Sequence, residues 1–308
     1  MRTATREPGV NDRQDRKCSD PVILNQWHPV AAVSEIPPAV IEETLLLGEP
    51  IAYTRDSDSN LMAWRVDEAA AGAPVVDSDR RLPIRTDFGY LWTSIGTPPA
   101  QLFSLPEVDE PGRIVHNAIT VGINVSAPRA VENFLDVAHL AFVHPGSLGE
   151  QPHTEIRDYE VSTVDGDIWA SDIQIYQPRM AAGSTSAALA EYIYRVPHPH
   201  CAVLYKRAET ASGRMDIYAG FVHALSEERI RLHLFDCVVE GSATAGEVRR
   251  FVQTIVGQDK SILENQNPKR LPLDPRAETP VRADKSSIAY RRYLTEIGLD
   301  YGVIRALE

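Results

Sequence analysis

The chain of 308 residues contains only three cysteines, and their spacing excludes the frameworks that cysteine usually builds. Cys18, Cys201 and Cys237 are odd in number and far apart, so they give no disulfide pattern. Cys201 and Cys237 also lack a neighbouring metal-ligand pattern, and we interpret both as buried thiols. Unpaired cysteines are typical of a reducing compartment, which predicts a cytoplasmic protein.

Positive charge and long apolar runs are also scarce. The sequence has 31 lysine and arginine residues against 43 aspartate and glutamate residues, a formal net charge of −12. This balance argues against nucleic acid as a partner, because phosphate binding requires basic patches. No apolar run approaches the roughly 20 residues of a membrane-spanning helix, so we expect no membrane segment. Residues 1–20 are polar and lack the apolar core of a signal peptide, which predicts a disordered tail.

The stretch from Glu132 to Gly149 combines apolar residues with polar residues at a regular spacing. Asn133, Asp136 and His139 recur every three residues, which places them on one side of a helix. Because the neighbouring residues are apolar, this side is expected to be buried, and buried polar groups need partners. The spacing therefore predicts a polar site inside the protein.

His144 follows His139 by five residues, which on a regular helix turns the two side chains apart. Pro145 disfavours helical geometry at the residue before it, so we predict a buried helix over Glu132–His144 that ends or distorts at His144. A distorted end brings the two imidazoles together as adjacent metal ligands. The alternative is a pair of hydrogen-bonded core histidines, and the residues alone leave both interpretations open.

A second polar residue interrupts an apolar pattern much later in the chain. Residues 245–265 carry apolar side chains at helical spacing, and Pro268 ends the helix that this pattern predicts. Asp259 lies within the apolar stripe, where a carboxylate is costly unless it is paired or bound to a metal. A last helix is predicted over residues 286–297.

Most of the remaining sequence predicts strands. From about Pro21, short runs rich in β-branched and aromatic residues alternate with Gly, Pro, Asp and Ser. An acidic, proline-containing linker ends near Pro111. The pattern predicts an α+β protein, with a β domain over residues 21–111 and antiparallel strands with helices over residues 112–308.

Two of these segments together resemble the iron site of the Rieske-type non-haem iron oxygenases. Residues 132–149 match the family's Asn-x2-Asp-x2-His-x4-His pattern, and residues 258–268, QDKSILENQNP, are similar to the later segment that supplies a carboxylate ligand. Residues 27–31 and 82–96 resemble strands of the family's Rieske domain, so the resemblance extends over most of residues 21–300. It is strongest to the vanillate and dicamba O-demethylases and the methylxanthine N-demethylases.

The resemblance implies a helix-grip catalytic domain over residues 112–308, in which one iron(II) ion is bound by His139, His144 and Asp259. Two histidines and one carboxylate leave positions open for O2 at such an iron. The resemblance also implies that Asp136 links a ligand histidine to a Rieske histidine on a neighbouring chain. Asn133 is then expected near the iron, and the protein is expected to form a trimer or a hetero-oligomer.

The ligands of a Rieske cluster are missing from the N-terminal region. Such a cluster needs two cysteines and two histidines, which the family supplies as Cys-x-His and Cys-x2-His within one domain. No cysteine lies between Asp20 and His200, and the segment that should hold the cluster is missing between Asp67 and Arg81. We therefore interpret residues 21–111 as a truncated Rieske-like domain without its own 2Fe-2S cluster. The resemblance implies that a reductase with a Rieske domain supplies electrons, and that a glutathione-S-transferase-like subunit belongs to the complex.

The implied function is oxidative N-demethylation of a methylxanthine, 7-methylxanthine to xanthine and formaldehyde, by the oxygenase component of a multicomponent monooxygenase that depends on a separate NAD(P)H reductase. One alternative is an O-demethylase or hydroxylase of another aromatic substrate. Another is a non-catalytic subunit that kept the fold. A third is a small-molecule binding protein on the same fold, with the histidines as polar pocket groups.

A strand near residue 220 offers candidates for the substrate pocket. Phe221 and His223 share one face of this strand, because strand side chains alternate. Dicamba-type oxygenases have a substrate-contacting histidine at a position resembling His223. We therefore predict that Phe221 and His223 line a pocket for a flat aromatic or purine substrate, with a core role for His223 as the alternative.

Overall fold

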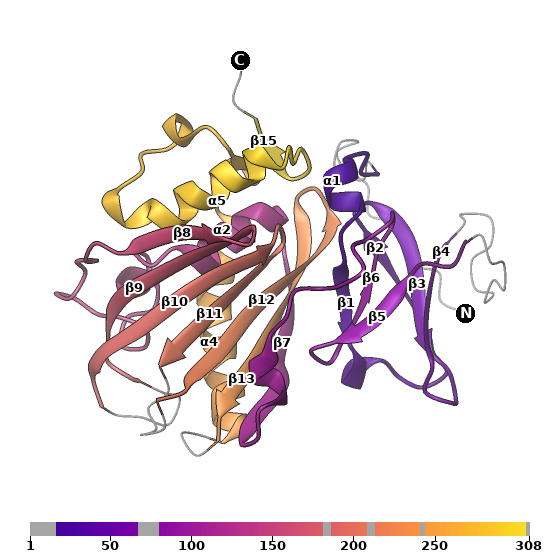
Figure 1. The fold of residues 1–308 in the computed structure, drawn as a ribbon, viewed down its shortest axis with the longest axis horizontal. Helices are drawn as coiled ribbons and strands as arrows, with labels where there is room; N and C mark the ends of the chain where they lie inside the picture. The colour runs from indigo at the N-terminus through magenta and orange to yellow at the C-terminus, as the bar shows by residue number, and fades with distance from the viewer. Residues whose placement is uncertain (1–16, 67–79, 181–185, 208–212, 241–243, 306–308) are drawn as a thin grey trace.

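The computed structural model describes residues 17–66, 80–180, 186–207, 213–240 and 244–305. Two small sheets form the N-terminal part of the protein, and one large antiparallel sheet with several helices forms the rest (Figure 1). The predicted α+β class is confirmed, because strands dominate and the helices pack on the large sheet. Among the described residues, no helix combines the length and the apolar character needed to cross a membrane.

Short strands make up the N-terminal part. They form two three-stranded sheets in the orders β1-β6-β5 and β2-β3-β4. The elements are α1 (Pro21–Leu24), β1 (His28–Ala32), η1 (Val33–Glu35), β2 (Ile41–Leu46), β3 (Glu49–Arg55), β4 (Leu61–Arg65), β5 (Ile84–Asp87), β6 (Tyr90–Thr93) and η3 (Pro106–Asp109). Residues 67–79, where the segment for a cluster is expected, lie outside the described residues.

The end of the predicted disordered tail needs a correction. Residues 1–16 lie outside the described residues, but residues 17–20 are held by the protein. Asp20 Oδ1 accepts a hydrogen bond from Val22 N at 2.9 Å and so caps α1, which replaces the strand expected to begin at Pro21. Asp20 Oδ2 accepts another from Asp300 N at 2.6 Å, which ties this segment to the far end of the chain.

The large sheet has seven antiparallel strands in the order β7-β13-β12-β11-β10-β9-β8. Its strands are β7 (Arg113–Ile123), β8 (Glu160–Val164), β9 (Asp167–Gln177), β10 (Ala188–His198), β11 (Cys201–Arg207), β12 (Met215–Ser226) and β13 (Arg229–Val239). Two further short strands, β14 (Leu271–Pro272) and β15 (Val303–Ile304), pair in parallel. Pro111, the predicted linker end, lies just before β7.

Helices pack on one face of this sheet, and the N-terminal part packs on the other face at β12. The helices are α2 (Ala127–Leu135), α3 (Leu140–Val143), α4 (Ala245–Glu264) and α5 (Lys285–Glu296), with short turns η4 (Pro275–Ala277) and η5 (Arg282–Asp284). α4 crosses the sheet with Val248, Val252 and Val256 buried beneath it (Figure 1). On the opposite face, Leu47 N donates to Ala224 O of β12 at 2.8 Å. Both faces of the sheet are therefore buried along β12 and β13.

The long helix agrees with the sequence prediction to within one residue. Thr244 caps it by accepting from Glu247 N, and the Glu247 side chain accepts from Thr244 N in return. This capping box fixes the first turn. The face that the apolar spacing predicted then lies against the sheet.

Residues 132–144 do not form the single helix predicted from the sequence. α2 ends at Leu135, and α3 covers only Leu140–Val143. Asp136 has an extended backbone, with φ −74° and ψ 118°, and its Oδ1 accepts a hydrogen bond from Ala138 N at 2.7 Å. This side-chain bond replaces a helical backbone bond, so the helix breaks ahead of both histidines.

A buried ion network fixes α2 to α5. Arg291 on α5 donates to Glu132 on α2 through Nε at 2.5 Å and through an Nη atom at 3.0 Å. Arg129 contacts the same carboxylate at 3.3 Å and Glu278 at 2.6 Å. All three residues are buried, with exposed fractions of 9% for Glu132, 4% for Arg129 and 8% for Arg291. Such charges are tolerated in the interior only because they are paired.

We predict that Glu132→Ala lowers the free energy of unfolding by about 3 kcal/mol, because two guanidinium groups lose a buried partner while Glu278 still contacts both. Urea unfolding followed by circular dichroism measures the change. Glu296→Ala removes an exposed carboxylate from α5 and is the control, with an expected change below about 0.5 kcal/mol. Equal stability of the two variants would show that the network contributes nothing.

Candidate metal centre

Two imidazoles come together because α3 is a single turn with a histidine at each end. His139 occupies the position before its first residue and His144 the position after its last. Their ring centroids lie 5.1 Å apart, and the two Nε2 atoms lie 3.2 Å apart. The structure therefore brings the predicted histidine pair together, although by a different break from the one expected.

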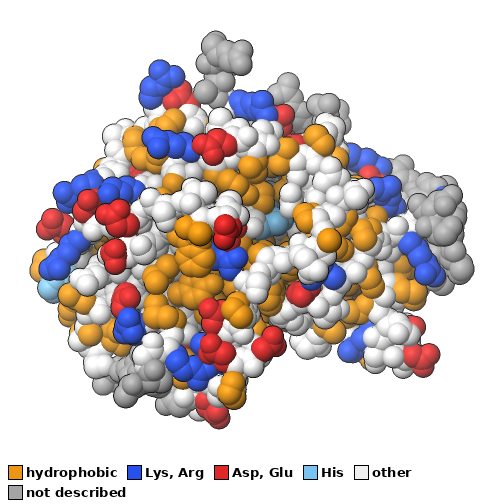
Figure 2. All heavy atoms as spheres, viewed as in Figure 1, with side chains coloured by type: hydrophobic (Ala, Val, Ile, Leu, Met, Phe, Trp, Pro, Cys, Tyr) orange, Lys and Arg blue, Asp and Glu red, His pale blue; other side chains and the backbone are white. Residues whose placement is uncertain are grey.

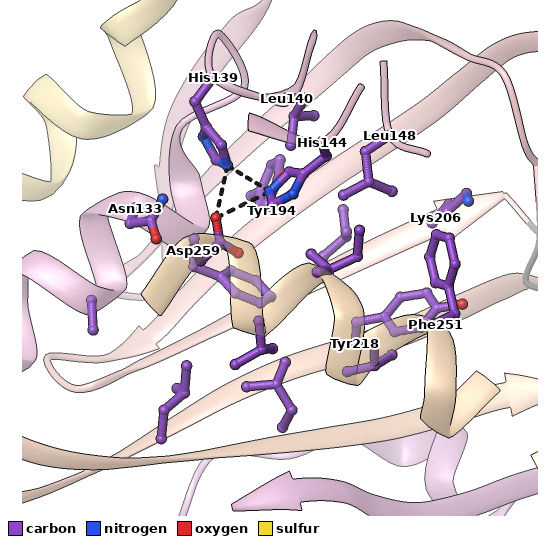
Figure 3. Close-up of a pocket in the computed structure, with 18 of the residues that line it drawn as sticks. Asn133, His139, Leu140, His144, Leu148, Tyr194, Lys206, Tyr218, Phe251 and Asp259 are labelled. Atoms are coloured by element: carbon purple, nitrogen blue, oxygen red, sulfur yellow. Dashed lines mark hydrogen bonds and ion pairs between the residues drawn. The ribbon is translucent and has the colours of Figure 1, made fainter. Parts of the chain in front are cut away.

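The long helix α4 adds a carboxylate to this pair (Figure 3). Asp259 Oδ1 lies 3.4 Å from His139 Nε2 and 3.0 Å from His144 Nε2. Among the described residues, these three are the group of histidine, cysteine and acidic side chains whose ligand atoms converge closely enough for a metal ion. The predicted ligand set therefore forms one cluster, built from segments more than a hundred residues apart.

The spacing of the three atoms fits a single divalent transition-metal ion. Two ligands each about 2.1 Å from a metal, at about 90–110° to one another, lie about 3.0–3.4 Å apart. Asp259 Oδ1 is buried, and no donor among the described residues satisfies it with hydrogen-bond geometry. A buried carboxylate oxygen without a donor is expensive unless a cation binds it. Two histidines and one carboxylate on one side of an ion are the ligand set of non-haem iron(II) oxygenases.

The electrostatics of the cluster also favour a cation. Burial lowers the pKa of His139, but the carboxylates of Asp136 and Asp259 outweigh burial and raise the pKa to about 9. Burial raises the pKa of Asp259, and the two histidines lower it below its usual value. Without a metal, a proton therefore balances these charges at neutral pH. A metal ion would displace that proton, because the ligand is the neutral imidazole.

Each histidine has a second partner that orients its ring. His144 Nδ1 lies 2.8 Å from Gln258 Oε1, so Nδ1 carries the proton and Nε2 is left to bind a metal. Asp136 Oδ2 lies 3.3 Å from His139 Nδ1 and likewise orients that ring, which leaves His139 Nε2 to bind a metal. Sequence reasoning missed Gln258, although it directly precedes Asp259 in the segment that carried the resemblance.

Glycine closes the turn that follows the second histidine. Gly146 adopts φ +74°, and its N–H donates to Gly149 O at 2.9 Å. A Cβ added to Gly149 would lie 2.8 Å from Cα and 2.9 Å from N of Ala141 in α3. Only glycine permits this approach, so the turn holds the helix that carries both histidines.

A cavity opens beside the triad, between α4 and the large sheet. Asn133 lies at the triad end, near Asp259, as expected (Figure 3). Leucine, valine, isoleucine and phenylalanine side chains form most of the walls, and Tyr218 and Lys206 lie at the other end. Apolar walls with a few converging polar groups are typical of small-molecule pockets.

The structure does not bring Phe221 and His223 to this cavity, where we expected them. Both side chains are fully buried on the opposite face of β12, against the N-terminal part. Phe221 stacks on Phe88 with ring centroids 5.8 Å apart, and His223 Nε2 lies 2.8 Å from Leu45 O. Side chains of β12 do alternate between the two faces as expected, but Tyr218 faces the cavity and Phe221 faces away from it. Because both faces of the sheet are apolar, the sequence pattern could not distinguish them.

The remaining histidines of the strands also lie outside the triad. His198 and His200 are buried beside His28, with ring centroids 6.0–6.3 Å apart. His233 is buried on β13, with Nδ1 3.0 Å from Thr120 Oγ1. Burial lowers the pKa of His198 and of His233 to about 3, so both are neutral core groups.

We predict that replacing His139, His144 or Asp259 by alanine abolishes iron binding while the fold persists. Each change removes one of three ligands, and no other ligand group converges there among the described residues. Iron content per chain after anaerobic reconstitution, together with circular dichroism, measures both effects. Wild-type iron occupancy in all three variants would exclude this triad.

We also predict that Gln258→Leu weakens iron binding about 10- to 100-fold, because His144 loses the acceptor that fixes its ring. A competition titration with a chelator gives the affinity. Ser261→Ala changes an exposed residue of the same helix and should bind iron like the wild type. If Gln258→Leu also matches the wild type, Gln258 does not orient the ligand.

Known proteins are similar to this chain in sequence and in fold. Residues 123–299 match the family model described as the vanillate O-demethylase oxygenase C-terminal domain. A probable methylxanthine N7-demethylase from Pseudomonas sp. (strain TJI-51) is 34% identical over 285 residues, which cover 92% of this chain and 97% of that protein.

Two solved structures have the same overall fold. The caffeine-bound methylxanthine demethylase NdmA of Pseudomonas putida superposes with a TM-score of 0.69 at 19% identity, over 89% of this chain and 91% of that one. Dicamba monooxygenase bound to dicamba gives a TM-score of 0.69 at 15% identity, over 89% and 97% of the two chains. The family match spans more than half of the sequence and the first relative nearly all of it, and the chain therefore belongs to the Rieske-type non-haem iron oxygenases of the vanillate O-demethylase kind.

Proposed function

We propose that the protein is the oxygenase component of a monooxygenase that removes the N7-methyl group of a methylxanthine. The observation that carries the proposal is the His-His-Asp triad in the wall of an apolar cavity. The 34% identity to a probable methylxanthine N7-demethylase supports the substrate class. Flat heteroaromatic rings suit a cavity with aliphatic and aromatic walls.

The triad fits iron(II), which when bound would supply the O2 chemistry that hydroxylates a methyl carbon. The overall change is N–CH3 plus O2, two electrons and two protons giving N–CH2OH and water. The N–CH2OH group then loses formaldehyde and leaves N–H. The protein's own contribution is to hold the methyl group beside the triad, to exclude bulk water with the apolar walls, and to keep the ligand imidazoles in one orientation.

A second cavity lies on the other side of His139, which supports a separate path for electrons. His139 and Asn133 border both cavities. Most residues that line the second cavity are polar or charged, and Asp136 is one of them. The Asp136 side chain is 31% exposed and contacts His139 Nδ1, so a partner's histidine can approach the triad through this carboxylate.

The electron donor in this proposal is a Rieske domain on a partner reductase. The three cysteines of this chain are far apart, and burial raises the thiol pKa of Cys201 and Cys237, which suits inert core groups. Exposed apolar side chains on α3 and α4, the two helices that position the triad, offer a docking surface. Phe142 on α3 is 61% exposed and Ile262 on α4 is 43% exposed. A hetero-oligomer in the cytoplasm with such a reductase, and with a glutathione-S-transferase-like subunit, completes the proposal.

The test separates chemistry from electron delivery. Iron-loaded protein with 7-methylxanthine, O2 and a chemical reductant should release formaldehyde and xanthine in a single turnover. Asp136→Asn should retain iron and this single turnover, but should lose at least about tenfold of the turnover driven by a Rieske-bearing reductase, because the charge beside His139 is gone.

Two results would contradict the proposal. An iron-loaded wild type that releases no formaldehyde from any methylxanthine would favour a non-catalytic subunit or a different aromatic substrate. Reductase-driven turnover of Asp136→Asn equal to the wild type would remove Asp136 from the electron path. Asp284→Asn, which changes another carboxylate of the second cavity, is the matched control.

A further inference from the structure

The substrate cavity has a polar end that the metal centre does not explain. Lys206 lines the cavity at the end away from the triad, with Tyr218 nearby (Figure 3). Lys206 is only 4% exposed. Lysine is rarely buried to this extent, because desolvating an ammonium group is costly. Most of the lining between the two polar ends is apolar.

The sheet register explains how the ammonium group is held there. Lys206 on β11 pairs with Tyr192 on β10 and with Asp216 on β12, so the three share a face of the sheet. Lys206 Nζ donates to Met180 O at 2.6 Å. Asp216 is buried, and burial raises the pKa of its carboxyl group, while the Val239 N–H and the positive charge of Lys206 act in the opposite direction. These neighbours keep the lysine side chain at the cavity.

We propose that Lys206 determines substrate orientation and specificity by donating to a carbonyl or ring-nitrogen acceptor on the edge of the substrate opposite the reacting methyl group. The inference rests on the proposed function, since it names how that same cavity selects its substrate. It defines the substrate class as a flat, neutral or anionic heteroaromatic ring with an acceptor far from its N-methyl group.

The chemistry of a methylxanthine matches these two ends. Its five-membered ring carries the N7-methyl group, and its six-membered ring carries the two carbonyl acceptors. With the methyl group at the triad, the six-membered ring extends toward Lys206. A charged donor in a low-dielectric cavity gives a strong hydrogen bond to such an acceptor and rejects rings that lack one.

The test compares two bicyclic N-methyl ligands, one with carbonyl and ring-nitrogen acceptors and one without them. The probes are 7-methylxanthine and 1-methylindole, a bicyclic N-methyl compound without carbonyl acceptors, each titrated anaerobically into the iron-loaded protein by calorimetry. Lys206→Met keeps an unbranched side chain and removes the donor. We expect it to weaken 7-methylxanthine binding about 10- to 100-fold, with 1-methylindole binding unchanged.

The control is Leu204→Met, which changes a side chain of the same strand and the same cavity face without altering its polarity. It should affect the two ligands equally. If Lys206→Met fails to fold, Lys206→Gln replaces it, since a neutral amide still occupies the site and should give an intermediate affinity for 7-methylxanthine. Unchanged 7-methylxanthine binding in the lysine variant, or an equal loss for both ligands, would overturn the inference. In either case wild-type demethylation would leave the proposed function standing, whereas a wild type that binds no methylxanthine would overturn both.

Discussion

Three ligand atoms must lie about 3 Å apart while the segments that carry them are separated by more than a hundred residues. Much of the catalytic part can be understood as a solution to this constraint. The capping box fixes the start of α4, and its valines hold the helix on the sheet, which places Asp259. The buried contact of Glu132 with Arg291 fixes α2, and Ser286 Oγ donates to Leu135 O at the end of that helix. Each contact limits the motion of one ligand segment.

The seven-stranded sheet supports two structures at once. One face carries the cavity and α4, and the other carries the N-terminal part, whose own two sheets pack against β12. The N-terminal part therefore has a structural role independent of any cluster, because it shields a row of large buried side chains from water.

Sequence reasoning succeeded where one signal determined the outcome. The apolar spacing of residues 245–265 predicted α4, and the unfavourable position of Asp259 within that apolar stripe predicted its role. The runs of β-branched and aromatic residues predicted the α+β class. It failed where two signals competed. Helical spacing outweighed the tendency of Asp136 to bond its own backbone, so the break was misplaced. On β12, burial of both faces removed the polar alternation that tells inside from outside, so Phe221 was chosen over Tyr218. The role of Gln258 could be found only in the structure, because nothing in a single sequence shows that a glutamine side chain contacts a histidine more than a hundred residues away.

The carboxylate of Asp136 serves two structural purposes. One oxygen accepts a hydrogen bond from Ala138 N just after the end of α2, and the other contacts His139 Nδ1. A protein that binds to this carboxylate from outside must therefore share it with the loop that carries a metal ligand. Docking and ligand geometry are then thermodynamically linked, and linkage is reciprocal. Any change in this loop would therefore also change the affinity for a protein bound at this carboxylate, and binding of that protein would change how His139 is held.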